Sequence, residues 1–207
     1  MNNSTHQLHM PVMLGEVTKY LKIESGGRYI DCTAGAGGHS EAILAASSPG
    51  GQLLGLEADP QAVVIARNRL EGYGSSALIV NENFSKLEQV CLEHKFIPVN
   101  GILFDLGLSS MQLGETGRGF SFQYDSPLDM RFSPDQDLTV SDIVNTYNEN
   151  EIADIIYRYG EEHASRRIAR NIVGSRPIKT TLQLAGIIEK SVGARKRERI
   201  HPATRSF

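Results

Sequence analysis

The chain has 207 residues, of which 40% are hydrophobic and 22% are charged, and its formal net charge is −3. A chain of this length can bury one good core, or one core and a small appendage. No stretch approaches the roughly 18 apolar residues that a membrane span needs, and the polar start at Met1–Met10 lacks the apolar core of a secretory signal. Two cysteines without a Cys-x-x-Cys pair argue against a disulfide framework or a zinc site, and they fit a reducing cytoplasm.

The net charge hides an asymmetry along the chain. Residues 1–159 contain 10 Lys and Arg against 20 Asp and Glu, a net charge of −10, whereas residues 160–207 contain 11 against 4, a net charge of +7. An acidic body with a basic final quarter indicates an anionic partner that meets one face of the protein. A solvated, charge-rich helix pair is the alternative interpretation.

The first hundred residues alternate strand and helix patterns. Between the predicted strands lie helical patterns at Ser40–Ala46, Pro60–Leu70 and Lys86–His94. This alternation predicts an α/β fold, a doubly wound parallel sheet with helices on both faces and the local strand order 3-2-1-4. A ligand is expected where strands 1 and 4 diverge. The four apolar runs that predict these buried strands are Tyr29–Cys32, Gln52–Leu56, Ala77–Val80 and Gly101–Asp105.

The pattern changes after Asp105. Residues 106–134 are rich in Gly, Ser, Asp and Pro with interspersed aromatic residues, which indicates a long, ordered and functional loop. Helical patterns come after this loop, each with a glycine or a polar residue where it would stop. The sequence therefore predicts two domains, 1–124 and 125–207. The predicted helices are Val140–Asn145, Glu149–Tyr159, Glu162–Val173 and Thr181–Val192.

A glycine-dense turn comes after the first predicted strand, where Tyr29–Ser40 reads YIDCTAGAGGHS. Glycines in such a turn let the backbone bend tightly and approach a ligand. A dinucleotide fingerprint, G-x-G-x-x-G, would need a third glycine where Ser40 stands. The loop instead resembles the glycine loop of S-adenosylmethionine-dependent methyltransferases. A turn in some other α/β protein remains the alternative.

Four polar or aromatic residues lie beyond the predicted strands. Glu57 ends strand 2, where a carboxylate can accept hydrogen bonds from both ribose hydroxyls of an adenosine ligand; Asp59 is the competing choice, unless it only caps the next helix. Phe84 lies after strand 3, where a ring can stack on adenine or simply join the core. Asp105 ends strand 4 and could hold the cofactor or the reacting group. Gln112 lies just beyond, with no evident structural role.

Seven segments together make the chain similar to the MraW-type (RsmH) family, the 16S ribosomal RNA cytosine-N4 methyltransferases. This resemblance covers the chain from residue 9 to residue 205 and implies a Rossmann-like, S-adenosylmethionine-dependent methyltransferase core with a helical insertion for substrate recognition. The segments are His9–Val17, Asp31–Ser40, Phe104–Leu113, Arg118–Phe122, Ser126–Arg131, Tyr159–Glu162 and His201–Arg205.

The resemblance also implies where the cofactor binds. Two positions depart from the family pattern, because Glu57 stands where the family commonly has Asp and Ala34 where a Phe is frequent. The first departure keeps the carboxylate and moves it by about one methylene; the second should alter packing more than chemistry. The implied contacts with S-adenosylmethionine are Gly37, Gly38, His39, Glu57, Phe84, Asp105 and Gln112.

The implied reaction is methyl transfer to the exocyclic amine of a cytidine in the decoding region of the small ribosomal subunit. That amine is a weak nucleophile, because its lone pair is delocalised into the ring. Asp105, or a backbone carbonyl within 106–110, is our hypothesis for the hydrogen-bond acceptor that activates it. The base would leave its stack, and Phe120 or Phe122 would receive it.

The basic segment is expected to contact RNA phosphates, which position RNA without reading its sequence. We expect a C-terminally shortened chain whose fourth strand is an open edge, which leaves room for a homodimer. Two other functions stay open: a truncated, non-catalytic module that binds S-adenosylmethionine or RNA, and a nicotinamide-dependent oxidoreductase, which Ser40 disfavours. The expected RNA contacts are Arg166, Arg167, Arg170, Arg195, Lys196, Arg197 and Arg199.

Overall fold

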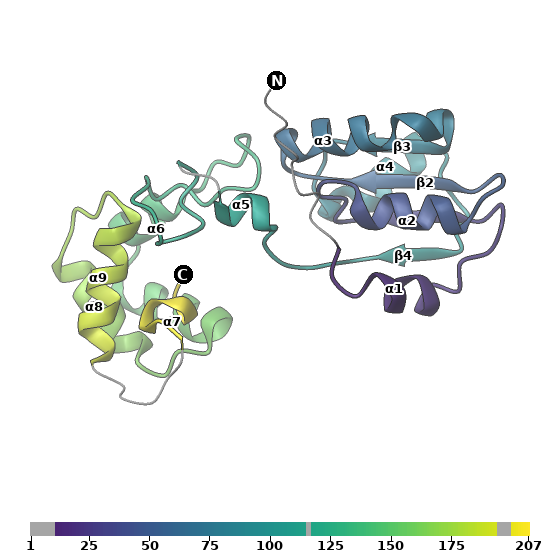
Figure 1. Cartoon of the computed structure of the whole chain (residues 1–207). Coiled ribbons are helices and arrows are strands. Elements are labelled where there is room, and N and C mark those ends of the chain that lie inside the picture. Colours follow the sequence, from purple (N-terminus) through teal and green to yellow (C-terminus); the bar gives the residue numbers. More distant parts are fainter. Residues whose placement is uncertain (1–10, 115–116, 194–199) are drawn as a thin grey trace, which may run out of the picture. The chain divides into compact units, whose positions relative to one another are not determined.

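The computed structural model describes residues 11–114, 117–193 and 200–207 and divides into two compact units, which meet in the chain between Gly107 and Leu108 (Figure 1). The sequence predicts a boundary after residue 124 instead. The difference arises because the intervening loop packs with the helical residues C-terminal to it. The Phe120 ring lies 5.2 Å from the Phe132 ring, and Phe122 packs against the helical core of the second unit.

The first unit is built on a four-stranded parallel sheet. Its strands are β1 (Arg28–Asp31), β2 (Gln52–Leu56), β3 (Ala77–Val80) and β4 (Gly101–Leu103). They lie in the order β3-β2-β1-β4, which confirms the predicted order. Since β1 pairs with both β2 and β4, the carboxyl ends of the three strands meet at one edge of the sheet.

Helices cover both faces of this sheet, as the alternation of patterns predicts. They are α2 (Gly38–Ala46), α3 (Pro60–Leu70) and α4 (Leu87–Glu93). A further helix, α1 (Leu14–Tyr20), precedes β1, and no sequence pattern predicted it. Two short 3-10 helices, Glu71–Ser76 and Phe84–Lys86, flank β3. Tyr29 and Leu53 pack with apolar residues of α2 and α3, whereas their neighbours Ile30 and Leu54 pack with Val90 of α4. Successive residues of a strand point to opposite faces, so each strand contributes to two cores.

β4 ends two residues before the predicted end at Asp105. The reason is the loss of a partner strand, because β1 itself ends at Asp31. The Cys32 N–H donates the last ladder bond to the Leu103 carbonyl, and the Asp105 N–H then donates to the Thr33 hydroxyl at 2.7 Å. Asp105 therefore stands just outside the sheet, at its carboxyl edge.

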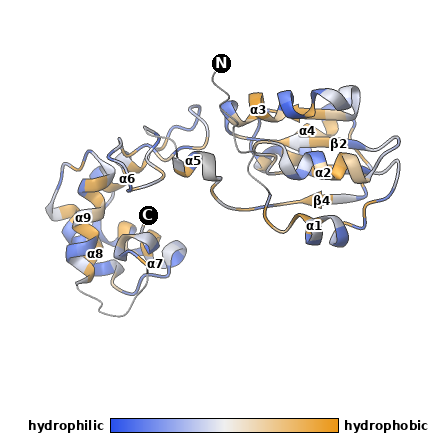
Figure 2. Ribbon diagram, in the orientation of Figure 1, coloured by the Kyte–Doolittle hydropathy of each residue, from blue (hydrophilic) through white to orange (hydrophobic). Residues whose placement is uncertain are grey.

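The second unit is helical. The helices α7 (Glu149–Gly160), α8 (Ser165–Gly174) and α9 (Thr181–Val192) each present apolar and polar residues (Figure 2). Their apolar sides share a core around Ile156, Ile168 and Ile188. α8 begins at Ser165 and not at Glu162 as predicted, because the Glu162 carboxylate accepts the Ala164 N–H at 2.7 Å and forms a turn. The elements are α5 (Ser110–Gly114), α6 (Val140–Thr146), α7 (Glu149–Gly160), α8 (Ser165–Gly174), α9 (Thr181–Val192) and the 3-10 helix η3 (Pro202–Arg205).

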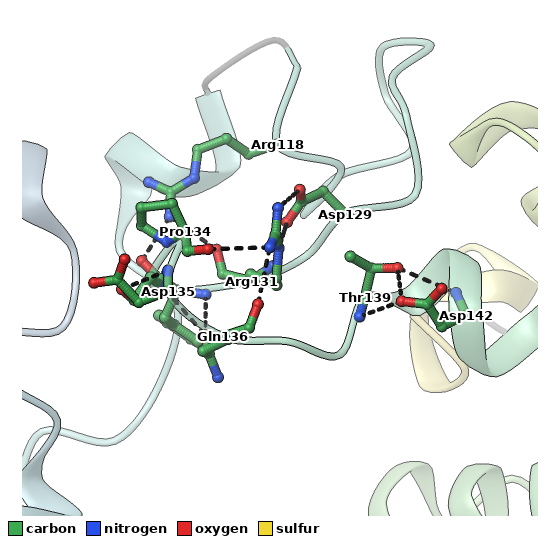
Figure 3. Close-up of polar contacts among 10 residues, drawn as sticks. Arg118, Asp129, Arg131, Pro134, Asp135, Gln136, Thr139 and Asp142 are labelled. Atoms are coloured by element: carbon green, nitrogen blue, oxygen red, sulfur yellow. Dashed lines mark hydrogen bonds and ion pairs between the residues drawn. The ribbon is translucent and has the colours of Figure 1, made fainter.

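Two arginines organise the described part of the long loop (Figure 3). The Arg131 guanidinium donates to both carboxylate oxygens of Asp129, at 2.9 and 2.8 Å, and to the carbonyls of Pro134 and Gln136. Arg118 donates to the Arg131 and Phe132 carbonyls, at 2.9 Å each. The hydrogen bonds from Arg131 hold the pKa of Asp129 below its ordinary value. These arginines therefore stabilise the folded conformation of the loop.

Within the three described ranges, none of the helices is long and apolar enough to cross a lipid bilayer.

Candidate cofactor site

The site begins at Asp31, the last residue of β1, whose side chain is fully buried. One carboxylate oxygen accepts the Ser40 hydroxyl at 2.7 Å, and the other accepts the Thr33 N–H at 3.1 Å. Burial raises the pKa of Asp31, and the hydrogen bonds from Ser40 and Thr33 offset part of that rise. Asp31 thus ties the end of β1 to the first turn of α2. Ser40 occupies the position of the third glycine in a dinucleotide loop, and its hydroxyl makes this tie.

The glycine loop connects β1 to α2, with a backbone that other residues adopt only under strain. Gly35 and Gly37 have φ angles of +52° and +81°. A Cβ on Gly38 would lie 2.5 Å from the Pro11 ring, and a Cβ on Gly37 would lie 3.3 Å from the Ala66 backbone in α3. The loop therefore fits closely against its neighbours, and its glycines are required by conformation and by space.

Glu57 lies directly after β2 and holds the glycine loop at Gly35. Its carboxylate accepts the Gly35 N–H and the Asp59 N–H, both at 2.8 Å. Burial raises the pKa of the Glu57 carboxyl above its ordinary value. Asp59 caps α3 by accepting the Gln61 N–H at 3.0 Å. The structure thus gives Asp59 the capping role and places Glu57 against the glycine loop.

Phe84 presents an exposed ring, so it is not simply a core residue. The ring is 40% exposed and meets Phe104 edge to face, with 5.7 Å between the ring centroids. The two residues lie after β3 and β4, the two edge strands of the sheet. The segments after these strands therefore come together. An exposed aromatic ring of this kind can stack on an adenine.

His39 and Asp105 face each other at the same edge. The His39 ring is only 6% exposed, and neither ring nitrogen has a hydrogen-bond partner among the described residues. Its Nε2 lies 3.4 Å from Asp105 Oδ2, an ion pair when the imidazole is protonated. The Asp105 side chain is 54% exposed, and only its backbone is fixed, by Thr33. Its carboxylate is thus available to a ligand.

Gln112 belongs to the second unit and does have a structural role, which corrects the interpretation of the sequence. Its side chain accepts the Ser109 N–H at 3.0 Å, and its own N–H donates to the Ser109 hydroxyl at 3.2 Å. This reciprocal pair is a capping box at the start of α5. The spacing Ser-x-x-Gln was the sequence signal for it.

The basic and aromatic candidates lie in the second unit. α8 bears Arg166, which is exposed, Arg167, which donates to the Val192 carbonyl at 2.9 Å, and Arg170, which lies 3.3 Å from Glu149. Phe120 is buried, and Phe122 is half-buried against the His201 and Phe207 rings. The burial of Phe120 contradicts the expectation that its ring receives a base, whereas the expectation for Phe122, which is partly exposed, stays a prediction. The other four basic candidates, Arg195, Lys196, Arg197 and Arg199, lie outside the described residues.

Two residues that no sequence pattern singled out join the site. Thr33 links β1 to the segment after β4 through its hydroxyl, and Phe104 supports the Phe84 ring. The first-unit candidates are thus linked by contacts and by the chain itself. Glu57 accepts a hydrogen bond from the glycine loop, His39 comes directly after that loop, and the His39 ring faces Asp105. Phe104 precedes Asp105 and contacts Phe84.

The strand order and the glycine loop define the Rossmann-like class of α/β proteins, which bind ligands at the carboxyl ends of the strands. More specifically, the chain belongs to the MraW methylase family, whose model matches residues 6–207.

Several relatives are highly similar over nearly the whole chain. A ribosomal RNA small subunit methyltransferase H of Dehalococcoides mccartyi is 59% identical over 199 residues, which are 96% of this chain and 57% of the relative. The protein of the same name from Thermomicrobium roseum is 50% identical and is covered to 62%. The chain therefore spans about three-fifths of the length of these curated relatives.

Similarity to solved structures is more distant. A protein-L-isoaspartate O-methyltransferase matches 55% of this chain and 34% of its own, with 14% identity and a TM-score of 0.39. An S-adenosylmethionine-dependent O-methyltransferase from Thermotoga maritima matches 39% of this chain and 31% of its own, with 21% identity and a TM-score of 0.35.

Proposed function

We propose that this chain binds S-adenosylmethionine and ribosomal RNA and acts in methyl transfer to the N4 amine of a cytidine in 16S rRNA of the small subunit. Membership of the MraW methylase family supports the reaction class. The observation that supports the site best is the cluster at the carboxyl edge, where the half-buried Glu57 carboxylate, an exposed ring and an exposed carboxylate lie around the glycine loop. We also propose that the reaction takes place in the cytoplasm, because the proposed substrate is ribosomal RNA.

The residues present fit the cofactor. The Glu57 oxygens each accept one backbone N–H and keep a lone pair for a ribose hydroxyl. The exposed Phe84 ring suits adenine, and the buried His39 nitrogens still lack partners within the described residues. Gly37 and Gly38 let the loop lie close to Ala66 and Pro11, and we assign their backbone a cofactor contact on the family resemblance. We also assign Gln112 a cofactor contact, which rests on the family resemblance alone.

S-adenosylmethionine supplies an electrophilic methyl group on a sulfonium. The chain must align the cytidine amine with it and raise the amine's weak nucleophilicity. Asp105 is our choice for this task, because its carboxylate is exposed while its backbone is fixed to Thr33. By accepting a hydrogen bond from the amine, Asp105 localises the lone pair and stabilises the positive charge that develops.

The arginines of α8 are the proposed phosphate contacts in the described part of the chain, with Arg166 the most available. Arg170 pairs with Glu149 across an exposed contact that is worth little and can be exchanged for a phosphate. RNA affinity should fall steeply with salt concentration, since each phosphate contact releases counterions. A flat salt response would mean that these arginines are only a solvated face.

Transfer of a labelled methyl group from S-adenosylmethionine to small-subunit RNA tests the function directly. We expect label in the RNA, at a cytidine identified by nuclease mapping. Isothermal titration with S-adenosylmethionine and with NAD is the parallel measurement, and we expect heat only with the first. Binding of cofactor and RNA without any transfer would establish the non-catalytic binding module instead.

A homodimer is a separate proposal, supported by the edge strand β4. This strand pairs only with β1 among the strands that the structure describes. Light scattering after size-exclusion chromatography tests it, and a monomeric mass at micromolar concentration would contradict it.

A further inference from the structure

Two of the segments that mark the family, Tyr159–Glu162 and His201–Arg205, come together in the second unit although they lie about 40 residues apart in the sequence. α7 ends at Gly160, and η3, yellow in Figure 1, ends at Arg205. A Cβ on Gly160 would overlap the carbonyl oxygen of Arg205. Glycine is therefore required here, because the backbone of η3 rests directly on the end of α7.

A cavity of about 600 Å³ lies at this junction. This volume is within the range of about 300 to 1,000 Å³ that is usual for small-ligand sites. All of its lining residues belong to the second unit, so it is distinct from the cofactor site of the first unit. They are Tyr157, Arg158, Gly160, Glu161, His163 and Arg205.

The lining combines an aromatic surface with two cations. The Tyr157 side chain is 54% exposed, and its ring lies 6.3 Å from the His163 ring at a tilt of 55°. The Arg158 and Arg205 side chains are both exposed. Among the described residues, Arg158 makes a long, exposed contact of 3.8 Å with Asp154, which is worth little and lets the guanidinium turn to a stronger anion.

The charge balance limits how many anions this cavity can hold. Glu161, which has a left-handed backbone at the end of α7, adds one carboxylate to the lining. Two arginines and one carboxylate line the cavity, and the Asp154 carboxylate lies 3.8 Å from Arg158, so the small excess of positive charge suits at most a single phosphate group and disfavours a polyphosphate. The exposed aromatic ring beside that phosphate site adds a surface on which a base can stack.

We propose that this cavity binds one nucleotide of single-stranded RNA, with its phosphate at Arg158 and Arg205 and its base on the Tyr157 ring. This inference rests on the proposed RNA substrate and deepens it. Duplex RNA keeps its bases stacked inside the helix, so only an unpaired nucleotide can use the exposed ring. The site positions a segment of the RNA on the second unit and leaves methyl transfer to the first.

Fluorescence anisotropy with a labelled single-stranded octaribonucleotide tests the site on the full chain. Tyr157→Ala should weaken binding about 5- to 100-fold, the usual effect of losing a base-stacking ring. Tyr157→Phe should bind with nearly the wild-type affinity, because it keeps an aromatic ring. Tyr159→Ala is the matched control, since Tyr159 is 85% exposed on the same helix but does not line the cavity. It should change affinity less than about 2-fold, within the spread usual for exposed surface substitutions.

Salt dependence separates the phosphate contact from a structural role. Arg205→Gln keeps the backbone that rests on Gly160 but removes one phosphate contact, so the slope of log affinity against log salt should fall by about 0.7. Tyr157→Ala should leave that slope unchanged, because it removes no ion contact. Lys190→Gln, an exposed charge on α9, is the control and should leave affinity and slope as they are.

The outcomes distinguish this site from the proposed function. If the cavity variants bind RNA as the wild type does while the wild-type chain still methylates small-subunit RNA, the cavity proposal is wrong and the function stands. If the wild-type chain binds no octaribonucleotide and transfers no methyl group, both are wrong. Equal loss of affinity in Tyr159→Ala and Tyr157→Ala would also overturn the cavity site.

Discussion

The Glu57 carboxylate accepts a hydrogen bond from the backbone N–H of Gly35, with 2.8 Å between Oε2 and the nitrogen. A residue after β2 thus holds the loop that connects β1 to α2. Glu57→Gln should weaken S-adenosylmethionine binding about 10- to 100-fold, because the neutral amide both loosens this tie and replaces one acceptor of the ribose hydroxyls by a donor. Isothermal titration measures the effect. Glu93→Gln, at the exposed end of α4, is the control, and equal affinities for both variants would contradict the assignment.

Burial of two carboxyls should make the stability of the chain depend on pH. The pKa values of Asp31 and Glu57 are raised by burial, so the folded state binds protons more tightly than the unfolded chain. Between the ordinary and the raised pKa values, the free energy of unfolding therefore falls as pH rises. Urea unfolding at a series of pH values should show a smaller fall for Glu57→Gln than for the wild type. Identical pH profiles would contradict this prediction.

The Phe84 ring should contribute stacking to cofactor binding. Phe84→Ala should weaken S-adenosylmethionine binding about 5- to 100-fold, and Phe84→Tyr should keep most of the affinity, since any aromatic face can stack. Phe104→Ala should have a smaller effect, because Phe104 only supports the ring from its side. Tyr20→Ala, an exposed aromatic on α1, is the matched control in the same titration. An unchanged affinity in Phe84→Ala would exclude the stacking role.

Asp105 should affect turnover more than cofactor binding. Asp105→Asn should lower methyl transfer at saturating cofactor by about 100-fold, because the amide no longer provides a charged acceptor for the cytidine amine. Titration with S-adenosylmethionine should establish that the variant is saturated in the transfer assay. Full turnover in Asp105→Asn would rule out the acceptor role and favour a backbone carbonyl within 106–110.

The pair of Asp129 and Arg131 should stabilise the second unit. Its bidentate contact lowers the pKa of Asp129, so its stabilisation is present above the ordinary carboxyl pKa and is lost as pH falls through the lowered value. Asp129→Asn should cost about 1 kcal/mol at pH 7 and progressively less in acid. Asp135→Asn, in the same loop, is the control in thermal unfolding, because Asp135 is exposed and its contact with Ser133 is made by its backbone N–H. Equal stability of the two variants would contradict this role.

The sequence by itself determined the sheet and its helices. Apolar runs and helical patterns are local, so they predict the order β3-β2-β1-β4, the bounds of β2 and β3, and helices on both faces. The residues at the carboxyl edge follow from that order, because the ends of parallel strands meet at one edge. The contacts of Glu57 and Asp105 there agree with that placement.

Only the tertiary structure decided what many polar and aromatic side chains do. Gln112 caps α5 and Phe120 is packed inside the long loop, although the sequence suggested no structural role for Gln112 and a base contact for Phe120. Arg131 stabilises the fold of the same loop, which no sequence pattern predicted. The junction of Gly160 with Arg205 was likewise absent from any local pattern. A side chain's partner is set by packing between distant segments, and a pattern within a dozen residues contains no information about that contact.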